Sequence, residues 1–384
     1  MVLKPKNDKK PTLIKYPGGK QKELKYILPE LPGDSKSFYE PFVGGGAVYL
    51  NIEANKYFIN DKSKELMTFY EMVCNQDKDF FNRLEKMNEY WKKIDILAVK
   101  YDKQLVDLYE CFKSNKQHGK DSIVEFIIQH YKVFNGLLSP DFNVDLEHFI
   151  NQISKTITNK FGRMQSMELK KGKLSEEDLK KNIWSSLKAA LYTHFRYLYN
   201  HSQSLNLSNS FNSALYYFIR EFCYSSMFRY NLNGEFNVPF GGISYAKKNL
   251  DTKIKRLQDP NIVNQLNITC KGSLDFEEFL NEYPPTSSDF IFVDPPYDTS
   301  FSTYAKNTFE KKDQERLAVY LIKKTNAKFM VVIKNTDFIK SIYPEGKTCT
   351  NGKPIRIIPF EKKYFVSFQN RNDKNAEHLI IMNY

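Results

Sequence analysis

The segment DFIFVDPPY, residues 289–297, ends an apolar run with an acid, two prolines and a tyrosine. Proline has no N–H, so Pro295 and Pro296 stop strand pairing while their carbonyl oxygens remain available as acceptors. Asp294 then presents a carboxylate beside the Pro295 carbonyl, and Tyr297 offers a flat ring nearby. Two acceptors and a stacking platform suit the exocyclic amine of a planar base. Pro-Pro-Tyr also occurs in ordinary loops, so a plain turn stays open as the alternative.

A glycine-rich segment, EPFVGGGAVYLN at 40–51, is the second candidate. Glycines after a strand let the backbone approach a ligand closely, and a following helix N-terminus favours polar or anionic groups. The segment lacks the third glycine of a dinucleotide fingerprint and the Lys-Ser/Thr of a phosphate-binding loop. Asp61 closes the next predicted strand 17 residues after Gly44. An acid there typically binds a ribose diol, although a turn followed by a helix-capping aspartate fits the residues equally well.

Short apolar runs predict the strands that would position these residues. SFYE is expected to be a strand followed by the glycine turn and a helix, and residues 57–61 form a second strand ending in Asp61. Later runs rich in Ile, Val and Phe suit a sheet that is buried on both faces. They are NQLNITC, DFIFVDPPY, KFMVVIKN and EHLIIMNY. The expected fold class is therefore α/β. Residues 1–12 are expected to be a flexible basic arm.

Helical periodicity dominates residues 76–205. An a/d-type seam predicts one long helix, with apolar residues at Phe80, Leu84, Met87, Trp91, Ile94, Ala98, Tyr101, Leu105, Leu108 and Phe112. A second stripe comprises Val124, Ile127, Ile128, Tyr131 and Phe134. A third comprises Ile183, Leu187, Leu191, Phe195 and Leu198. We expect a helical subdomain inserted into the α/β frame.

Composition limits the class of protein. The net charge of +12 indicates a polyanionic partner or a well-solvated surface. No apolar run approaches the roughly 20 residues of a membrane span, and the N-terminal residues lack a signal-peptide core. The five cysteines are scattered, which favours reduced thiols in a cytoplasmic protein and argues against a zinc site.

The order of the motifs is more specific than any one of them. KYPGGK at 15–20, which alone could be a surface turn, precedes EPFVGGG, IND and DPPY. Together they resemble the Dam-like (D12 class, alpha group) DNA adenine-N6 methyltransferases. FRYNLNGEFNVPFG at 228–241 is similar to the family's target-recognition hairpin. The resemblance covers roughly residues 11–75 and 205–384.

This resemblance implies a Rossmann-like S-adenosylmethionine-dependent methyltransferase sheet with an inserted helical and target-recognition domain. The expected parts are the N-terminal catalytic part at 1–75, the helical insertion at 76–205, the recognition hairpin region at 206–260 and the C-terminal catalytic part at 261–384. The implied partner is double-stranded DNA, with no membrane. The expected location is the cytoplasm, in association with the nucleoid. A cognate restriction endonuclease and the oligomeric state are left open.

By similarity, S-adenosylmethionine lies over the glycine turn. The residues that would contact the cofactor are Tyr16, Lys20, Phe42, Gly44, Asp61, Asp275, Phe276 and Asp294. Asp61 would hold the ribose hydroxyls, and Asp275 with Phe276 would hold the cofactor's adenine. Tyr16 and Pro17 replace the family's usual tryptophan and alanine.

The resemblance also assigns the reaction to Asp294, Pro295, Pro296 and Tyr297. The target adenine leaves the helix at a cost of roughly a few kcal/mol, and stacking on Tyr297 returns ~1–3 kcal/mol. Asp294 and the Pro295 carbonyl accept the two N6 hydrogens and orient the nitrogen. Direct transfer then needs no covalent enzyme intermediate.

DNA recognition is implied for the hairpin and for Lys15. Arg229 matches an arginine that reads a guanine edge, a contact that gives ~1–3 kcal/mol of discrimination. Met227 and Pro239 match apolar contacts to thymine methyls, and Lys15 approaches the opening base. The implied site is of the GATC type, although the sequence departs from the family after Gly241. Four further residues are expected to make hairpin or phosphate contacts: Asn231, Asn237, Lys247 and Lys248.

Two rival functions fit part of the pattern. An amino-group methyltransferase acting on cytosine N4 or on RNA more often carries Ser or Asn before the prolines, so Asp294 favours adenine. A non-catalytic DNA-binding module would not need an intact DPPY and Asp61. For the inserted helices, contact with DNA, a partner protein and dimerisation all stay open.

Overall fold

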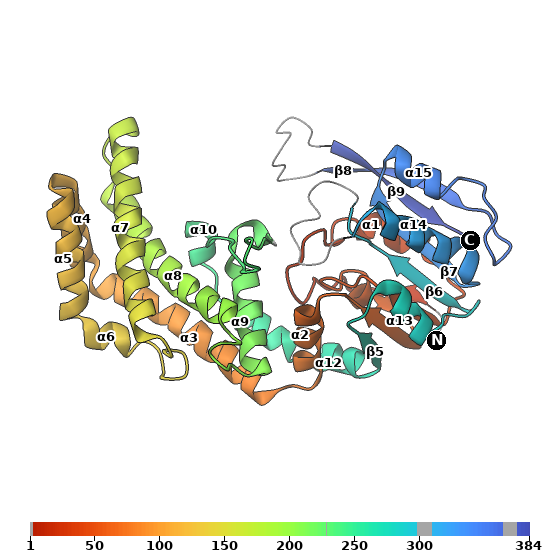
Figure 1. The fold of residues 1–384 in the computed structure, drawn as a ribbon, viewed down its shortest axis with the longest axis horizontal. Coiled ribbons are helices and arrows are strands. Elements are labelled where there is room, and N and C mark those ends of the chain that lie inside the picture. The colour runs from red at the N-terminus through yellow and green to blue at the C-terminus, as the bar shows by residue number, and fades with distance from the viewer. Residues whose placement is uncertain (1–2, 228, 298–308, 364–374) are drawn as a thin grey trace. The chain divides into compact units, whose positions relative to one another are not determined.

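The computed structural model describes residues 3–227, 229–297, 309–363 and 375–384. The chain divides into two compact units (Figure 1). The first, which we call the sheet unit, comprises Met1–Asn75, Phe228–Tyr230 and Asp259–Tyr384. The second, the helical unit, comprises Gln76–Met227 and Asn231–Gln258.

A mostly parallel sheet forms the centre of the sheet unit. Within the described residues it has seven strands in the order β5-β4-β2-β6-β7-β9-β8. The strands are β2 (Ser37–Glu40), β4 (Lys56–Asn60), β5 (Thr269–Gly272), β6 (Asp289–Val293), β7 (Lys328–Lys334), β8 (Arg356–Lys363) and β9 (Asn375–Met382). Those from β5 to β7 are parallel, and β9 runs antiparallel to both β7 and β8. The predicted α/β class is confirmed, and this sheet is consistent with the fold of S-adenosylmethionine-dependent methyltransferases.

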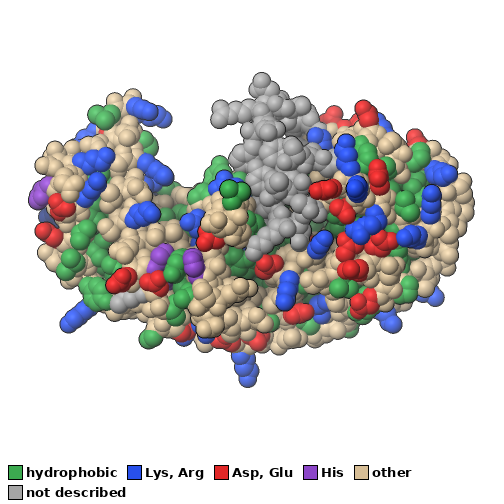
Figure 2. All heavy atoms as spheres, in the orientation of Figure 1, with side chains coloured by type: hydrophobic (Ala, Val, Ile, Leu, Met, Phe, Trp, Pro, Cys, Tyr) green, Lys and Arg blue, Asp and Glu red, His purple; other side chains and the backbone are tan. Residues whose placement is uncertain are grey.

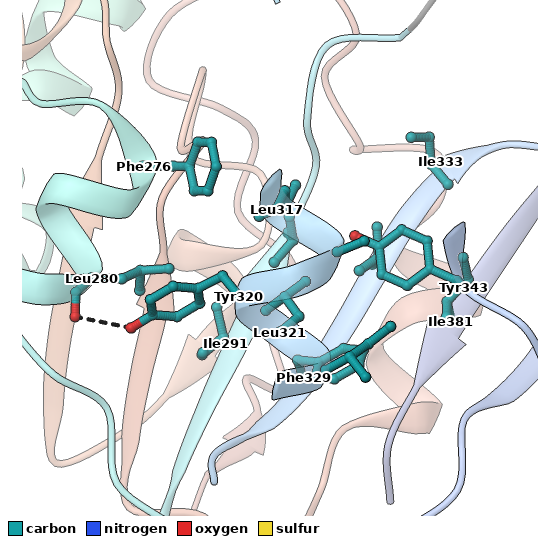
Figure 3. Close-up of a cluster of buried hydrophobic side chains, with 14 of the residues drawn as sticks. Phe276, Leu280, Ile291, Leu317, Tyr320, Leu321, Phe329, Ile333, Tyr343 and Ile381 are labelled. Atoms are coloured by element: carbon teal, nitrogen blue, oxygen red, sulfur yellow. Dashed lines mark hydrogen bonds between the residues drawn. The ribbon is translucent and has the colours of Figure 1, made fainter. Parts of the chain in front are cut away.

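An apolar cluster lies between one face of this sheet and three helices (Figure 3). The helices are α13 (Phe276–Glu282), α14 (Lys311–Val319), which continues into a π-helical turn at Tyr320–Lys324, and α15 (Asp337–Ile342). Ile291 of β6 and Phe329 of β7 belong to this cluster together with Leu317, Tyr320 and Leu321. The Tyr320 hydroxyl donates to the Leu280 carbonyl at 3.1 Å. All five residues of β6 are buried, so the strand that leads to Asp294 is firmly held.

Several short elements complete the sheet unit. They are β1 (Lys4–Pro5), α1 (Leu24–Ile27), β3 (Ile52–Glu53), α2 (Lys64–Cys74), α12 (Pro260–Asn267) and 3-10 turns at Leu28–Glu30 and Tyr49–Asn51. Three expectations were wrong here. The arm is not free, because β1 pairs with β3 and Lys6 donates to Gln265 at 2.6 Å. Only a 3-10 turn follows the glycines. The run at 264–270 is the end of a helix and the start of β5, because Pro260 initiates α12 after the Asp259 cap.

Helices make up the helical unit. They are α3 (Lys78–Lys100), α4 (Asp102–Ser114), α5 (Lys116–Gln129), α6 (Tyr131–Asn135), α7 (Leu146–Lys171), α8 (Glu176–Asn200), α9 (Asn209–Phe222), α10 (Ile243–Ala246), α11 (Asp251–Leu257) and a 3-10 turn at Tyr224–Ser226. None of the helices in the described part of the chain is long and apolar enough to cross a membrane.

The predicted long helix is broken. Tyr101, with φ −109° and ψ 17°, leaves the helical region and separates α3 from α4. Most of the seam is nevertheless buried on both sides of the break. Because the break preserves the burial pattern, periodicity alone did not reveal it.

The second stripe is confirmed only in part, whereas the third is confirmed. Ile127 and Phe134 of the second stripe are buried as predicted. Val124, Ile128 and Tyr131 are 45%, 67% and 39% exposed, and the buried side of α5 carries Ile123 and Phe126 together with Ile127. Consecutive apolar residues in this segment allow more than one helical face to be chosen. The third stripe lies buried along α8, at Ile183, Leu187, Leu191, Phe195 and Leu198.

Candidate active site

The residues expected to carry the chemistry follow two adjacent parallel strands. β2 pairs with β4 on one side and with β6 on the other. The chain segments that leave the carboxyl ends of β2 and β6 therefore emerge at one edge of the sheet. In open α/β sheets, ligands bind outside such an edge where the strand order reverses. The glycine turn follows β2 there, and Asp294 follows β6.

A buried lysine brings Asp294 and Tyr297 together. The Lys20 side chain is 2% exposed, and its ammonium donates to the Asp294 carboxylate, to the Gly18 carbonyl at 3.0 Å and to the Tyr297 hydroxyl at 3.3 Å. Burial raises the pKa of Asp294, and Lys20 opposes that rise. The ion pair thus favours a charged acceptor in a place where desolvation would favour a neutral one.

The two proline carbonyls differ in their partners. The Pro296 carbonyl accepts a hydrogen bond from Gln314 Nε2 at 2.7 Å. The Pro295 carbonyl accepts none from the residues that the structure describes. The Tyr297 ring lies at 64° to the His378 ring, with centroids 5.5 Å apart. Asp294, the Pro295 carbonyl and an oriented aromatic ring thus lie within one four-residue segment.

A second ion pair lies beside this cluster, and sequence reasoning missed it. Lys362 on β8 pairs with Glu23 at 2.7 Å, with side chains 12% and 6% exposed. Lys362 also hydrogen-bonds the Tyr297 hydroxyl, and Glu23 Oε2 is buried without a hydrogen-bond partner among the residues that the structure describes. Glu23 follows KYPGGK closely and could have been noticed. Lys362 gave no signal, because only the antiparallel return of β8 and β9 places it here.

Asp61 and Gly44 meet as their spacing suggested. The Gly44 N–H donates to Asp61 Oδ2 at 3.1 Å, and the Ser63 N–H donates to Oδ1 at 3.0 Å. Tyr16 adds a side-chain hydrogen bond to the same carboxylate. Burial nevertheless raises the pKa of Asp61 to about 6. Gly44 has a φ of +49°, and a Cβ there would lie 3.1 Å from the Tyr16 ring, so both its conformation and its surroundings favour glycine.

Aromatic rings cluster around Phe42, which follows β2. Phe42 lies 5.7 Å from Phe276 and 5.5 Å from Phe309, centroid to centroid. Asp275 caps α13 by accepting from the Glu277 N–H at 3.0 Å. Its carboxylate also pairs with Arg316 at 2.7 Å. The Asp275 side chain therefore already has structural partners, and Phe309 and Arg316 are neighbours that sequence reasoning did not single out.

The residues expected to recognise DNA are divided between the units. Lys15 and Arg229 belong to the sheet unit, and Met227, Asn231 and Pro239 belong to the helical unit. Phe228, the first residue of the expected hairpin, lies outside the described residues. The structure therefore does not bring the five together within one unit.

Residues 231–241 of the expected hairpin belong to the helical unit. An isolated bridge joins Cys223 to Phe240, and the Tyr224 N–H donates to the Pro239 carbonyl at 2.8 Å. Asn231 holds the tip: its side-chain oxygen accepts from the backbone N–H of Asn233 at 3.1 Å and of Glu235 at 2.9 Å. These hydrogen bonds stabilise the turn at the end of the loop.

The remaining hairpin residues vary in exposure. Pro239 and Lys247 are exposed, whereas Met227 and Asn237 are half-buried. The Lys248 ammonium lies 3.8 Å from the centroid of the Tyr245 ring.

Comparison with known proteins decides the family. The model of the D12 class N6 adenine-specific DNA methyltransferase family matches residues 16–145 and 128–357. The chain belongs to this family. The family resemblance and the enzyme class predicted from the motifs, DNA adenine-N6 methyltransferase, are confirmed.

Two relatives match this D12-class chain over nearly its whole length. The Type II methyltransferase M.CviBI of Paramecium bursaria Chlorella virus NC1A is 24% identical over 377 residues, which cover 97% of this chain and 99% of the relative. The Type II methyltransferase M.MjaIII of Methanocaldococcus jannaschii is 26% identical over 388 residues, covering 97% and 98%. A DNA adenine methylase of Vibrio cholerae is 28% identical over 78 residues, covering 20% of this chain and 28% of the relative.

Proposed function

We propose that this D12-class enzyme transfers a methyl group from S-adenosylmethionine to N6 of an adenine flipped out of duplex DNA. The observation that carries the proposal is the cluster at the end of β6, where Lys20 donates to both Asp294 and Tyr297. The Pro295 carbonyl beside it has no donor among the described residues. The pair of acceptors expected from DPPY is thus available beside an aromatic ring.

Asp294 and the Pro295 carbonyl would accept the two N6 hydrogens. Withdrawing these hydrogens toward oxygen raises the electron density on nitrogen and fixes its direction. Lys20 keeps the carboxylate charged, so the acceptor is ready before the base arrives, and preorganisation of this kind lowers the barrier. The same carboxylate would stabilise the positive charge that develops on N6 and receive its surplus proton.

Tyr297 would stack on the flipped base. Its hydroxyl is bonded by Lys20 on one side and by Lys362 on the other, so the ring does not need to be ordered when the base enters. We propose Lys362 as a positioning residue that acts through Tyr297. Stacking of ~1–3 kcal/mol per base would offset much of the cost of extruding the adenine.

The residues at the end of β2 fit S-adenosylmethionine. A Cβ on Gly44 would crowd the Tyr16 ring, which suits a turn that a ligand approaches closely. Asp61 would accept hydrogen bonds from the ribose hydroxyls, while Phe42 and Phe276 would contact the adenine ring and Tyr16 and Lys20 would border the cofactor. The Asp275 carboxylate already pairs with Arg316, so Asp275 would act chiefly by fixing the start of α13. When bound, the cofactor supplies an electrophilic methyl group.

Recognition of a GATC-type site is the finer part of the proposal. Arg229 would read a guanine edge in bidentate fashion, Met227 and Pro239 would contact thymine methyls, and Lys15 would approach the opening base. Lys247 and Lys248 would contact phosphates. In this division of labour, residues 76–205 form an inserted helical domain and residues 206–260 form the recognition region.

A restriction-modification system is the proposed setting. Two relatives that match along almost the full chain carry the name Type II methyltransferase. A cognate endonuclease cutting the same sequence would be the functional partner.

The test is methylation of unmodified duplex DNA by the purified protein, with every modified base mapped by sequencing. We expect N6-methyladenine at one short motif containing a single adenine per strand. Modification of cytosine alone, or of RNA alone, would overturn the proposal. Arg229→Ala is expected to relax one guanine position in the motif.

A further inference from the structure

A long polar ridge runs along α7 in the helical unit. From Asn151 onward, residues at steps of four and three share one exposed face. The exposed residues of this ridge are Asn151, Lys155, Asn159, Arg163, Ser166 and Lys170. The ridge carries three cations and no acid. At about 1.5 Å per residue, the stretch from Lys155 to Lys170 spans roughly 22 Å.

The cations of α7 differ from those of the neighbouring helix α8 in their ion pairs. Among the described residues, no carboxylate pairs with Lys155, Lys160, Arg163, Lys170 or Lys171. On the adjacent helix α8 the lysines are paired: Lys180 with Asp102 at 2.9 Å and Lys181 with Glu177 at 2.5 Å. The contrast lies within one unit, so a generally basic composition does not explain it.

Lys160 and Arg163 of α7 lie close enough to repel each other. Burial, and then the nearby Arg163, lowers the pKa of Lys160. Like charges placed close together without a counter-ion repel, and an anionic ligand would relieve that repulsion. Lys and Arg side chains line the surface where Figure 1 draws α7, whereas acidic and basic side chains are interspersed over the visible face of the sheet unit (Figure 2).

α8 connects this ridge to the recognition loop. On one side of α8, Tyr192 donates to the Val238 carbonyl at 2.9 Å, and Asn200 exchanges hydrogen bonds with Phe236 at 3.0 and 2.9 Å. On another side, His194 of α8 contacts His148 of α7 with 3.3 Å between their Nδ1 atoms. The ridge and the loop are therefore parts of one packed unit.

We propose that the α7 ridge binds the phosphate backbone of duplex DNA outside the recognised sequence. This inference rests on the proposed function only in taking DNA as the substrate. Duplex DNA carries one negative charge per about 1.7 Å of axis, so a ridge of this length can meet several phosphates. Asn151 and Asn159 add amide donors of the kind that commonly contact phosphate oxygens.

The test compares two triple variants of equal charge change. Lys155→Gln, Arg163→Gln and Lys170→Gln remove the ridge cations, while Lys93→Gln, Lys180→Gln and Lys181→Gln remove lysines that are paired with carboxylates. Binding is measured at several salt concentrations on a short duplex that just contains the site and on a duplex extended on both sides. Thermal unfolding verifies that both variants are folded.

For the ridge variant, we expect weaker binding to the extended duplex and a salt slope shallower by about three, since each lost phosphate contact removes about 0.9. The short duplex, the methylated motif and kcat should stay as in the wild type, and the control variant should bind like the wild type. Equal behaviour of both variants on the extended duplex would overturn the inference, and would favour an acidic protein as the partner of α7. The inference would also be overturned if the ridge variant lost as much affinity for the short duplex as for the extended one.

Footprinting of the wild type gives a second measurement. Protection should extend beyond the methylated motif on at least one side and should shrink in the ridge variant. Protection confined to the motif would contradict the inference. If the wild type protects DNA beyond the motif but forms no N6-methyladenine, the proposed function is overturned, whereas the inference that the α7 ridge binds DNA stands.

Discussion

Lys20 and Asp294 form an ion pair at the carboxyl end of β6, with side chains 2% and 18% exposed. Burial raises the pKa of the Asp294 carboxyl, and the Lys20 ammonium lowers it in part. A pair of this kind contributes little to net stability compared with apolar packing, because desolvation offsets the attraction. In the proposed mechanism its value would be chemical, since it favours the charged form of the carboxylate that would accept the hydrogens of the target amine.

Replacing Lys20 by Met should raise the pKa of Asp294 further, because only the burial contribution and weaker neighbours remain. In the proposed mechanism the charged form is the active one, so activity should be lost as pH falls through that pKa. The acid limb of the kcat profile should therefore move to higher pH. Lys25→Met, at an exposed position, is the matched control. If the acid limb of the Lys20 variant stays at the wild-type pH, Lys20 does not keep Asp294 charged.

Cofactor binding should weaken as pH falls below about 6, the raised pKa of Asp61. Protonation of Asp61 removes the carboxylate that would accept hydrogen bonds from the ribose hydroxyls. Because the pKa of Asp61 is raised in the folded protein, Asp61 is protonated at a higher pH there than in the unfolded chain. Calorimetric titration with S-adenosylmethionine at pH 8 and pH 5 measures the effect. Asp61→Asn should weaken binding by about 1.5–3 kcal/mol at pH 8 and flatten the pH dependence, whereas Glu345→Gln should do neither. Equal affinities of the wild type at both pH values would contradict this assignment.

Gly44→Ala should lose both stability and cofactor affinity. The positive φ of Gly44 costs roughly 1–2 kcal/mol for any residue with a Cβ, and the new methyl would lie 3.1 Å from the Tyr16 ring. Gly33→Ala is the control, because no atom lies within 4 Å of a Cβ at that position. Thermal unfolding and cofactor titration of both variants decide the matter. A Gly44 variant that matches the Gly33 variant would show that the turn tolerates a side chain.

Acid should destabilise the helical unit through His194. Burial lowers the pKa of His194 from 6.5 to about 4, so between these values the unfolded chain binds more protons and the free energy of unfolding falls as pH is lowered. His194 Nε2 lies 2.8 Å from the Phe142 carbonyl and its Nδ1 lies 3.3 Å from that of His148. A second ring proton would disrupt this contact. His194→Gln should reduce the loss of Tm between pH 7 and pH 5; an unchanged loss would point to other groups.

Much of the site could be predicted from the sequence because its residues follow strand ends. Asp294 and Asp61 each come directly after a buried strand of a parallel sheet, so the fold places both at the same edge. Gly44 could be predicted because only a residue without a Cβ suits that turn. These positions depend on local chemistry and on strand order, which are both written in short stretches of sequence.

The rest depends on tertiary packing. Lys362 lies beside Tyr297 only because β8 and β9 return beside β7. No local sequence pattern around Lys362 predicts this contact. The break at Tyr101 preserves the burial of the seam on both sides, so periodicity could not locate it. In the same way, Ile123 faces the core whereas the predicted Val124 and Ile128 are exposed. The side on which α5 packs decides this, and the sequence of one helix does not reveal that side.

The most direct test replaces Asp294 by Asn and measures N6-methyladenine in duplex DNA after digestion to nucleosides and mass spectrometry. The amide keeps the size of the carboxyl but loses its charge and directs a donor at the target amine. Loss of a preorganised electrostatic contact of this kind typically costs about 10²–10³ in kcat. The account predicts a loss of that size, with Asp337→Asn as active as the wild type and with both variants folded. Undiminished N6-methyladenine from the Asp294 variant would contradict it.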